Sequence, residues 1–285
     1  MNHQLVLALD VGGSSVKSAL VEDGQRIVGS VCVDVIQSGA SATEILNGFA
    51  AILSTYLEKT SGVSRIAFAF PGPFDYEQGI SLMHNQAKYE ALYGINIATK
   101  LREILGAPTL EMRFRNDAEA AILGEALHGA GVPYARLLGL TLGTGLGSAF
   151  IANGNLITQG ENFPPHGWLY SCMFESQCAD DVFSTRGLLT RLRQRGIQTV
   201  DISSAMHTTD HNALKDVFTS FGADLGVFLE PFVSAFHADA VLVTGGIAET
   251  WERFAPSMIR VLQVPVLRGI LGNRAALLGA AALYF

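Results

Sequence analysis

Two short glycine turns are the first candidates for chemistry in this sequence. Asp10 ends an apolar strand predicted over residues 4–10 and is followed by Gly12, Gly13 and Ser14. Glycine turns present successive N–H groups that can bind an anion, and a carboxylate beside them can hold Mg²⁺ or its waters. An ordinary hairpin without a ligand has the same local pattern. This turn therefore indicates either an anion site with a metal beside it or a plain β-turn.

The second turn is Gly143-Thr144-Gly145-Leu146-Gly147. It lies between a strand predicted over residues 137–142 and another over residues 148–152. Neither turn has the Gly-x-x-x-x-Gly-Lys-Ser/Thr pattern, which excludes a P-loop. The second turn also lacks the last spacing of Gly-x-Gly-x-x-Gly and leads into a strand instead of a helix, so it does not predict a dinucleotide fold.

Asn116 and Asp117 form a third candidate, because they follow a strand predicted over residues 109–114 and open a helix predicted over residues 117–128. Asn or Asp at this place caps the free N–H groups of a helix, and the nearby Glu119 favours the same end. A strand-to-helix junction also exposes functional side chains in α/β sheets. Asp117 is therefore interpreted either as part of a cap or as a general base that accepts a proton from a hydroxyl.

Short apolar runs alternate with longer helical patterns, which indicates an α/β protein. The first half predicts an antiparallel meander and then a helix that begins with the capping-box pair Ser41 and Glu44. Its expected elements are strands over residues 4–10, 16–21, 26–33, 65–70 and 109–114, and a helix over residues 97–105.

The second half repeats the opening in outline. The strand–turn–strand unit of residues 10–15 recurs at residues 142–147, Asn153-Gly154 predicts a hairpin turn, and a strand over residues 240–244 leads into Gly245 and Gly246. We therefore expect two halves of similar topology. The predicted lobes are residues 1–116 and 117–272, with a C-terminal helix of about residues 273–285 returning to the first.

Composition excludes several classes of protein. The chain has 285 residues, a net charge of −7, 49% hydrophobic and 16% charged residues, which is far from the composition of disordered chains. The acidic balance without a Lys/Arg block argues against nucleic acid. No apolar run reaches the ~20 residues of a membrane span, and no basic leader opens the chain.

Cysteines and the remaining motifs add less. Three cysteines in a chain of this size favour a reduced, cytoplasmic setting. His207 and His211 have a metal-ligand spacing, but a helix start between them favours separate faces. Several phenylalanines at helical spacing predict core: Phe218, Phe221, Phe228, Phe232 and Phe236.

The ordered set of motifs resembles the ROK family of sugar kinases and sugar-responsive repressors. The matching segments are residues 10–17, 116–125, 142–147 and 243–247, with Phe70 to Asp75, Asn85 and residues 277–281 as further matches. The resemblance implies an α/β fold of two ribonuclease-H-like lobes, of the actin and hexokinase type, with ATP-Mg²⁺ and a sugar in an interlobe cleft.

The resemblance also implies roles for individual residues. Asp117 would be the base, Asn85 and Asn116 would bind the sugar, and Asp10 would organise Mg²⁺, through water. Nucleotide contacts are expected at Gly12, Gly13, Ser14, Lys17, Gly143, Thr144, Gly145, Gly245 and Gly246. The implied reaction is ATP-dependent phosphorylation of a hydroxyl on a small-molecule sugar, either a hexose such as glucose or an N-acetylhexosamine.

One stretch departs from the family pattern. Where family kinases carry Gly-Glu-x-Gly-His, this chain keeps Glu161 and has His166 as the matching candidate. Cys172 and Cys178 lack companion cysteines, so we expect no structural zinc. Asp180 and Asp181 stand near the place of a further sugar-binding Glu, and the sequence does not choose between them.

Two rival functions follow from the same resemblance. A repressor of this family would carry an N-terminal helix-turn-helix, for which the first strand leaves no room. A non-catalytic homologue that binds a sugar or a nucleotide is favoured by the altered region 161–181 and opposed by the presence of both Asp10 and Asp117. A homodimer is compatible with the sequence, which does not decide the oligomeric state.

Overall fold

The computed structural model describes residues 3–85, 88–160, 163–207 and 210–285. Contacts divide the chain into two units. The first contains residues 1–124 together with 273–285, and the second contains residues 125–272. The chain therefore passes between the units at Gly124–Glu125, inside a helix, and again at Gly272–Asn273.

The first unit is built on a five-stranded sheet with the order β3-β2-β1-β4-β7. β1 to β3 are antiparallel to one another, whereas β4 and β7 run parallel to β1. The strands are β1 (Leu5–Val11), β2 (Ser15–Glu22), β3 (Arg26–Val35), β4 (Arg65–Phe70) and β7 (Glu111–Asn116), with a small pair β5 (Phe74–Asp75) and β6 (Ile80–Ser81) beside them.

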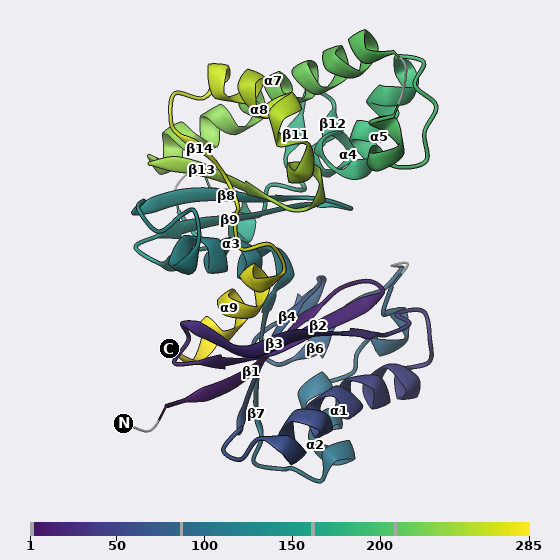
Figure 1. Ribbon diagram of the computed structural model, residues 1–285, viewed down its shortest axis with the longest axis vertical. Helices are drawn as coiled ribbons and strands as arrows, with labels where there is room; N and C mark the ends of the chain where they lie inside the picture. Colours follow the sequence, from purple (N-terminus) through teal and green to yellow (C-terminus); the bar gives the residue numbers. More distant parts are fainter. Residues whose placement is uncertain (1–2, 86–87, 161–162, 208–209) are drawn as a thin grey trace. The chain divides into compact units, whose positions relative to one another are not determined.

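Helices cover both faces of this sheet (Figure 1). Leu7 and Leu9 of β1 belong to the core formed with α1 (Ala42–Lys59) and α2 (Ile97–Leu105). The alternate residues Val6 and Ala8 are also fully buried, on the opposite face, and β1 and β4 contact α9 (Ala275–Ala281). Both faces of the central strands are therefore buried from solvent, as is usual for parallel strands.

The second unit repeats this topology with the order β10-β9-β8-β13-β14. Its strands are β8 (Arg136–Leu142), β9 (Leu146–Ala152), β10 (Asn155–Ile157), β13 (Ala240–Thr244) and β14 (Val266–Arg268), with a small pair β11 (Met173–Phe174) and β12 (Gln177–Cys178). Its helices are α4 (Ala179–Phe183), α5 (Thr185–Gln194), α6 (Ile202–Ala205), α7 (His211–Phe236) and α8 (Trp251–Val261). The order and directions match those of the first sheet, which confirms the predicted topological repeat.

α3 (Asp117–His128) carries the chain out of the first unit, and glycines let it approach α9 closely. A Cβ on Gly124 would lie 2.0 Å from the Ala275 carbonyl oxygen, and one on Gly279 would lie 1.8 Å from the Ala120 carbonyl oxygen. No side chain fits at such distances. The glycines are thus required by the crossing of the two helices.

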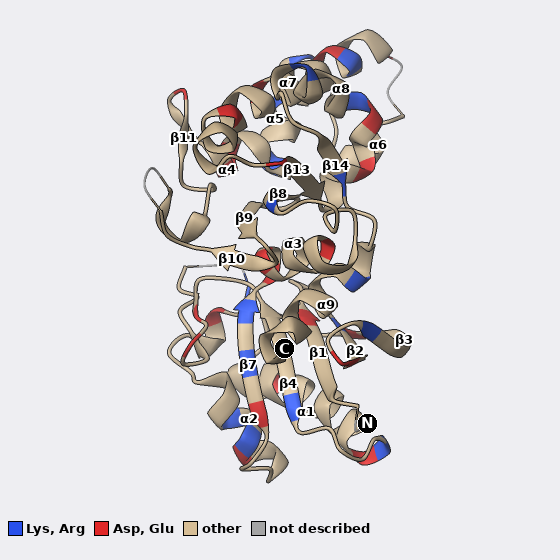
Figure 2. Ribbon diagram, turned by 90° about the vertical axis from the view of Figure 1, so that its left-hand side faces the viewer, with Lys and Arg blue, Asp and Glu red and all other residues tan. Residues whose placement is uncertain are grey.

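Residues after α9 are also tied to the first sheet. β7 carries Arg113 and Arg115, which show as blue bands on this strand in Figure 2. Arg113 donates to the Leu283 carbonyl at 2.5 Å and Arg115 to the Gly279 carbonyl at 2.7 Å. The Tyr284 hydroxyl donates to the Ile66 carbonyl at 3.0 Å. These bonds explain why residues 273–285 belong to the unit that begins the chain.

Most predicted elements are confirmed. The helices over 97–105 and 117–128 and the strands over 65–70 and 240–244 have the predicted bounds, and the remaining predicted strands differ from the structure by one to two residues at their ends. The Ser41–Glu44 capping box forms, and Asn153 and Gly154 both have positive φ, as a hairpin turn of this kind needs.

The predicted phenylalanine core is also confirmed. Phe218, Phe221, Phe228 and Phe236 of α7 are buried, and Phe232 packs on the same core. His207 precedes Asp210, which caps α7, and His211 is the first residue of the helix. The two histidines therefore do not share a helix face. Among the described residues, no helix has the length and apolar character needed to span a bilayer.

Candidate functional site

Parallel pairing in the first sheet brings the predicted catalytic segments to one edge. Asp10 is in register with Ala69 of β4, and Asn116 is in register with Phe70 of the same strand. The carboxyl ends of β1, β4 and β7 therefore lie together, as they do at ligand sites of open α/β sheets. Asp10 and the Asn116-Asp117 pair reach the same edge although they are far apart in the sequence.

Asn116 is the cap of α3. Its side-chain oxygen accepts the backbone N–H groups of Ala118 at 3.0 Å and Glu119 at 3.2 Å, and its side-chain nitrogen donates to the Tyr76 hydroxyl at 3.0 Å. The capping interpretation is therefore confirmed for Asn116. The amide nitrogen carries a second N–H, so the predicted contact of Asn116 with a sugar stays a prediction.

Asp117 is half-buried at the start of the same helix, and its Oδ1 accepts the Ala118 N–H at 2.9 Å. Loss of hydration raises the pKa of the Asp117 carboxyl above its ordinary value. The Lys88 ammonium and the Ala118 N–H act in the opposite direction, and the negative charge of Asp10 adds to the rise. A carboxylate with a raised pKa is a stronger base, which suits proton abstraction from a hydroxyl.

The first glycine turn lies between β1 and β2 and is held from outside. The Gly12 N–H donates to the Ser15 carbonyl at 2.9 Å. The Tyr89 hydroxyl donates to the Gly12 carbonyl at 2.6 Å, and the Ser38 hydroxyl donates to the Gly13 carbonyl at 2.5 Å. Because both carbonyl oxygens are taken by protein donors, they are turned away from any anion that the turn binds.

Asp10 and Lys17 face one another across β1 and β2. They are register partners, and Lys17 Nζ lies 3.0 Å from Asp10 Oδ2. Carboxylate oxygen is the donor that Mg²⁺ prefers, and among the described residues the side chain of Asp10 is hydrogen-bonded through Oδ2 only. Oδ1 can therefore serve Mg²⁺ or one of its waters, so Asp10 fits the role that the sequence predicts.

Lys88 is a charged residue near this site that the sequence analysis missed. It is half-buried, and its stem lies over Gly13: a Cβ on that glycine would lie 3.6 Å from Lys88 Cδ. The available signal was that Lys88 is the only Lys or Arg between Arg65 and Lys100. It was overlooked because it sits in an irregular segment whose position depends on distant bonds.

The second glycine turn, in the other unit, is held by α4 and α5. Asp180 Oδ1 accepts the Leu146 N–H at 2.7 Å, and the Gly143 carbonyl accepts the Thr185 N–H at 2.7 Å and its hydroxyl at 2.9 Å. Arg186 donates to Asp180 at 3.0 Å and to Asp181 at 2.6 Å. Of the two aspartates, Asp180 is therefore the one that contacts the turn.

Gly245, in the loop after β13, packs against Leu142, the residue that precedes the second turn. It has φ of +93°, and a Cβ there would lie 2.5 Å from the Leu142 carbonyl oxygen and 2.8 Å from the Leu142 nitrogen. Only glycine satisfies both conditions. Gly245 and Gly246 are exposed and stand next to the turn that begins at Gly143. The structure thus brings the predicted nucleotide-binding glycines of this unit together.

The predicted sugar contacts come from different parts of the chain. Asn85 is exposed with φ of +55°, and its N–H donates to Glu90 Oε1 at 3.2 Å. His166, in the second unit, is exposed, and its ring lies 4.8 Å from that of Trp168. Glu161 lies outside the described residues. These three stay predictions of the sequence.

Cys172 precedes β11, and Cys178 is the last residue of β12. The Ala179 N–H donates to the Cys172 carbonyl at 2.8 Å, and the Cys178 thiol donates to the Tyr170 carbonyl at 2.8 Å. Both thiols are free. The segment around the β11–β12 pair is therefore closed by hydrogen bonds to backbone carbonyls, and the expectation of no structural zinc stays a prediction.

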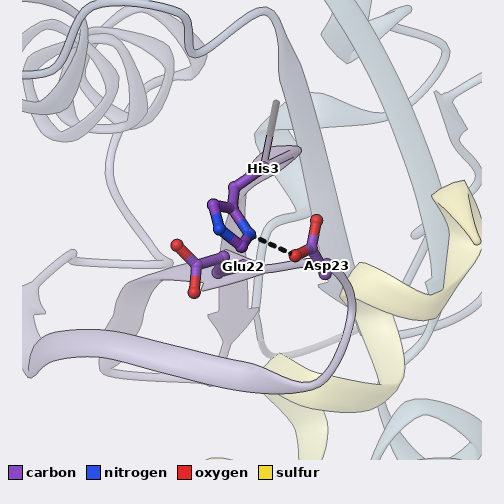
Figure 3. Close-up of side chains that lie close together, drawn as sticks. All are labelled: His3, Glu22 and Asp23. Carbon is purple, nitrogen blue, oxygen red and sulfur yellow. Dashed lines mark hydrogen bonds and ion pairs between the residues drawn. The ribbon is translucent and has the colours of Figure 1, made fainter. Parts of the chain in front are cut away.

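Figure 3 shows a different group of possible ligands, His3, Glu22 and Asp23, whose ligand atoms lie within 4.8 Å of one another. His3 Nδ1 lies 2.7 Å from Asp23 Oδ2, and the Gln4 N–H donates to Asp23 Oδ1 at 2.8 Å. Both oxygens of Asp23 are thus engaged, and the hydrogen bond with His3 lowers the pKa of Asp23. We interpret this exposed group as a tie between the start of β1 and the β2–β3 turn.

A cavity of about 520 Å³ lies in the first unit between β3 and α1. Its lining includes Cys32, Tyr56 and Lys59 but none of the predicted site residues. The candidate site is therefore placed at the strand ends, where the charged groups meet.

Comparison with known proteins agrees with this geometry. The sequence pattern that defines the ROK family matches residues 6–284. The chain belongs to the ROK family. The match spans nearly the whole chain, both glycine turns and the Asn116-Asp117 junction included.

Several relatives of this chain are named as sugar kinases. A glucokinase from Thermotoga maritima is 23% identical over 98% of this chain and 96% of its own length. An N-acetyl-D-glucosamine kinase from Haemophilus influenzae is 24% identical over 97% and 98%. The solved structure of a ROK family glucokinase from Streptomyces griseus, in complex with glucose and AMPPNP, matches with a TM-score of 0.75 at 22% identity over 98% of each chain. The predicted α/β fold of the actin and hexokinase type is confirmed.

Proposed function

We propose that this ROK protein is an ATP-dependent kinase that phosphorylates a hydroxyl of a hexose or an N-acetylhexosamine. The observation that carries the proposal is Asp117: a carboxylate with a raised pKa at the start of α3, directly after β7, within the electrostatic influence of Asp10 and in the unit that holds the first glycine turn. The names of the relatives support the class of reaction. ATP as the donor is supported by the analogue AMPPNP in the glucokinase complex.

The proposed reaction needs one proton acceptor and a fixed phosphoryl donor. Asp117 takes the proton of the sugar hydroxyl, the hydroxyl oxygen forms a bond to the γ-phosphorus of ATP, and the bond from that phosphorus to the β–γ bridging oxygen breaks to release ADP. Asn85, Asn116, His166 and Glu161 are the proposed sugar contacts. Fixing the hydroxyl against the phosphorus supplies much of the rate, because no covalent enzyme intermediate is needed.

Nucleotide binding is assigned to the two glycine turns and to their neighbours. The proposed contacts are the N–H groups around Gly12, Gly13, Ser14, Gly143, Thr144 and Gly145, the Lys17 ammonium, and Gly245 with Gly246 for the adenosine. Mg²⁺ near Asp10 would supply charge neutralisation on the phosphates. The turns suit this role because their outward carbonyls are bonded elsewhere.

The experiment is a coupled ADP-release assay over a panel of hexoses and acylated aminohexoses, with and without Mg²⁺. We expect one sugar class to give turnover that depends on Mg²⁺ and disappears with Asp117→Asn. Phosphorylation of no sugar in the panel by a folded protein that binds Mg-ATP would contradict the proposal.

A second candidate is a non-catalytic homologue that binds a sugar or a nucleotide. It is favoured by the altered region 161–181, where Asp180 holds the second turn and Arg186. A chain of this kind would bind glucose or AMPPNP in calorimetry without releasing ADP in the assay above. The two outcomes separate the candidates.

A further inference from the structure

A cation that belongs to neither glycine turn stands beside the proposed catalytic base. Lys88 comes from the segment between β6 and α2, outside both strand–turn–strand units. It is half-buried, and its stem packs over Gly13. Burial raises the pKa of the Asp117 carboxyl, and the positive charge of Lys88 acts against that rise.

The neighbouring residue fixes the place of Lys88. Tyr89 is fully buried, its backbone N–H donates to the Ser38 carbonyl at 2.7 Å, and its hydroxyl donates to the Gly12 carbonyl at 2.6 Å. Its ring stacks on Phe49 with a centroid distance of 6.2 Å. These contacts attach the Lys88-Tyr89 pair to the first glycine turn.

Lys88 differs from Lys17 in how its charge is used within the protein. Lys17 Nζ is 3.0 Å from a carboxylate oxygen of Asp10. Among the residues that the structure describes, Lys88 forms no ion pair and no hydrogen bond. A half-buried ammonium whose charge acts on Asp117 and whose donors have no partner among the described residues is suited to an anionic ligand that brings more charge than the carboxylate does.

We propose that the Lys88 ammonium binds the phosphoryl group that ATP transfers. Negative charge on the phosphoryl oxygens must be held while the proton of the sugar hydroxyl moves to Asp117, and a fixed cation at this place lowers the cost of bringing the two anions together. The inference rests on the proposed kinase function and adds to it the residue that contacts the transferred group.

The test compares Lys88→Met with Lys88→Arg and with Lys100→Met. Lys100 is an exposed lysine of α2 in the same unit, paired with Glu103 at 2.6 Å, so its replacement removes the same charge away from the site. Affinities for Mg-AMPPNP and Mg-ADP are measured by calorimetry in the presence of a sugar that the wild-type protein phosphorylates. Turnover is measured by ADP release.

We expect Lys88→Met to weaken Mg-AMPPNP binding by about tenfold or more and Mg-ADP binding by less than about threefold, because only the former carries the third phosphoryl group. Turnover should fall by at least about 10²-fold, as for loss of one oriented donor. Lys88→Arg should restore part of both losses, and Lys100→Met should match the wild type.

Two results overturn the inference in different ways. Equal weakening of Mg-AMPPNP and Mg-ADP, or unchanged binding and turnover, would contradict the role of Lys88 while leaving the kinase function in place. Wild-type protein that neither binds Mg-AMPPNP nor phosphorylates a sugar would contradict the proposed function and this inference together.

Discussion

The two glycine turns share their topology and differ in what surrounds them. In both turns, a glycine carbonyl accepts a hydrogen bond from a distant segment: Gly12 from Tyr89 and Gly143 from Thr185. The first turn is flanked by Lys17 and Lys88. In the second, a carboxylate, Asp180, takes up one of the N–H groups.

This difference indicates that the two copies of the repeated unit have different roles. The repeated strands build two glycine turns, whereas the groups proposed for proton transfer and charge stabilisation, and the carboxylate that holds the second turn, come from segments outside the repeat. Asp117 comes from the start of α3, Lys88 from an irregular segment, and Asp180 from α4. The first turn is expected to serve chemistry, and the second to serve binding of the nucleotide.

The largest effect is expected at Asp117, the proposed base in the unit of the first turn. Asp117→Asn removes the proton acceptor but keeps a side-chain oxygen for the Ala118 N–H. Turnover should fall by at least ~10²-fold, the lower end for general-base catalysis. ADP release and circular dichroism measure the two properties.

Asp216→Asn is the matched control, because Asp216 forms an ion pair with Arg195 at 3.5 Å in the second unit. It should leave turnover unchanged. A folded Asp117→Asn protein with wild-type turnover would leave Asp117 as a helix-terminal residue only, and would remove the chemical distinction between the turns.

A smaller effect is expected at the second turn. Asp180→Ala leaves the Leu146 N–H without its acceptor, so the turn loosens and the KM for ATP should rise by about tenfold, with a smaller change in kcat. Asp181→Ala removes a neighbouring carboxylate that also bonds Arg186 and should stay close to wild type. Steady-state kinetics with ATP and sugar varied separately checks this.

The same kinetics can decide the alternative that the sequence left open. If Asp180→Ala raises the KM for the sugar and leaves the KM for ATP unchanged, then Asp180 is a sugar contact. The second turn would then be held by Thr185 without the carboxylate, and the comparison between the turns would need to be redrawn.

The pH dependence of stability gives a third prediction. Because burial raises the pKa of Asp117 in the folded state, the folded protein binds this proton more tightly than the unfolded chain does. The ionised carboxyl therefore destabilises the protein above that raised pKa, and the penalty disappears as the pH falls toward the ordinary range of aspartate.

Asp117→Asn should accordingly be more stable than the wild type at neutral pH, and the difference should shrink on acidification. A gain of ~1 kcal/mol would raise Tm by about 2–4 °C for a domain of roughly 150–250 residues. Scanning calorimetry across pH measures it. A difference that grows at low pH would show that the carboxyl is stabilised in its charged form.

The smallest effect is expected for the hydroxyl that holds the first turn. Tyr89→Phe deletes the bond to the Gly12 carbonyl and should lower the free energy of unfolding by about 1 kcal/mol. It should also reduce kcat/KM severalfold, because the turn and Lys88 lose a shared anchor.

Tyr56→Phe is the control for Tyr89→Phe. The Tyr56 hydroxyl bonds the Ser18 hydroxyl at 3.1 Å in the same unit but away from the strand ends. It should lower stability by a similar amount with unchanged activity. Equal activity in the two variants would show that the turn does not depend on Tyr89.

Local patterns in the sequence were sufficient for the elements that place the site. The capping box at Ser41 and the bounds of the helix that begins at Asp117 follow from residues within one turn of each other. The two glycine turns were identifiable as turns because glycines at the ends of apolar runs permit a tight change of chain direction.

Long-range contacts explain what the sequence could not predict. Lys88 and Tyr89 lie at the first turn only because Tyr89 bonds Gly12 and Ser38. Asp180 and Asp181 are adjacent and chemically alike, and the choice between them depends on how α4 sits against the second turn. No pattern within a few residues carries that information.

The attachment of residues 273–285 to the first unit has a consequence for the order of synthesis. A ribosome that has completed residue 124 must add the whole second unit before α9 can cover β1 and β4. At about 5–20 residues per second, that interval lasts on the order of ten seconds. During it the face of the first sheet that carries Val6 and Ala8 stays uncovered, and the second unit has its full sequence before the first unit does. The unit whose synthesis begins first is thus the unit whose sequence is completed last.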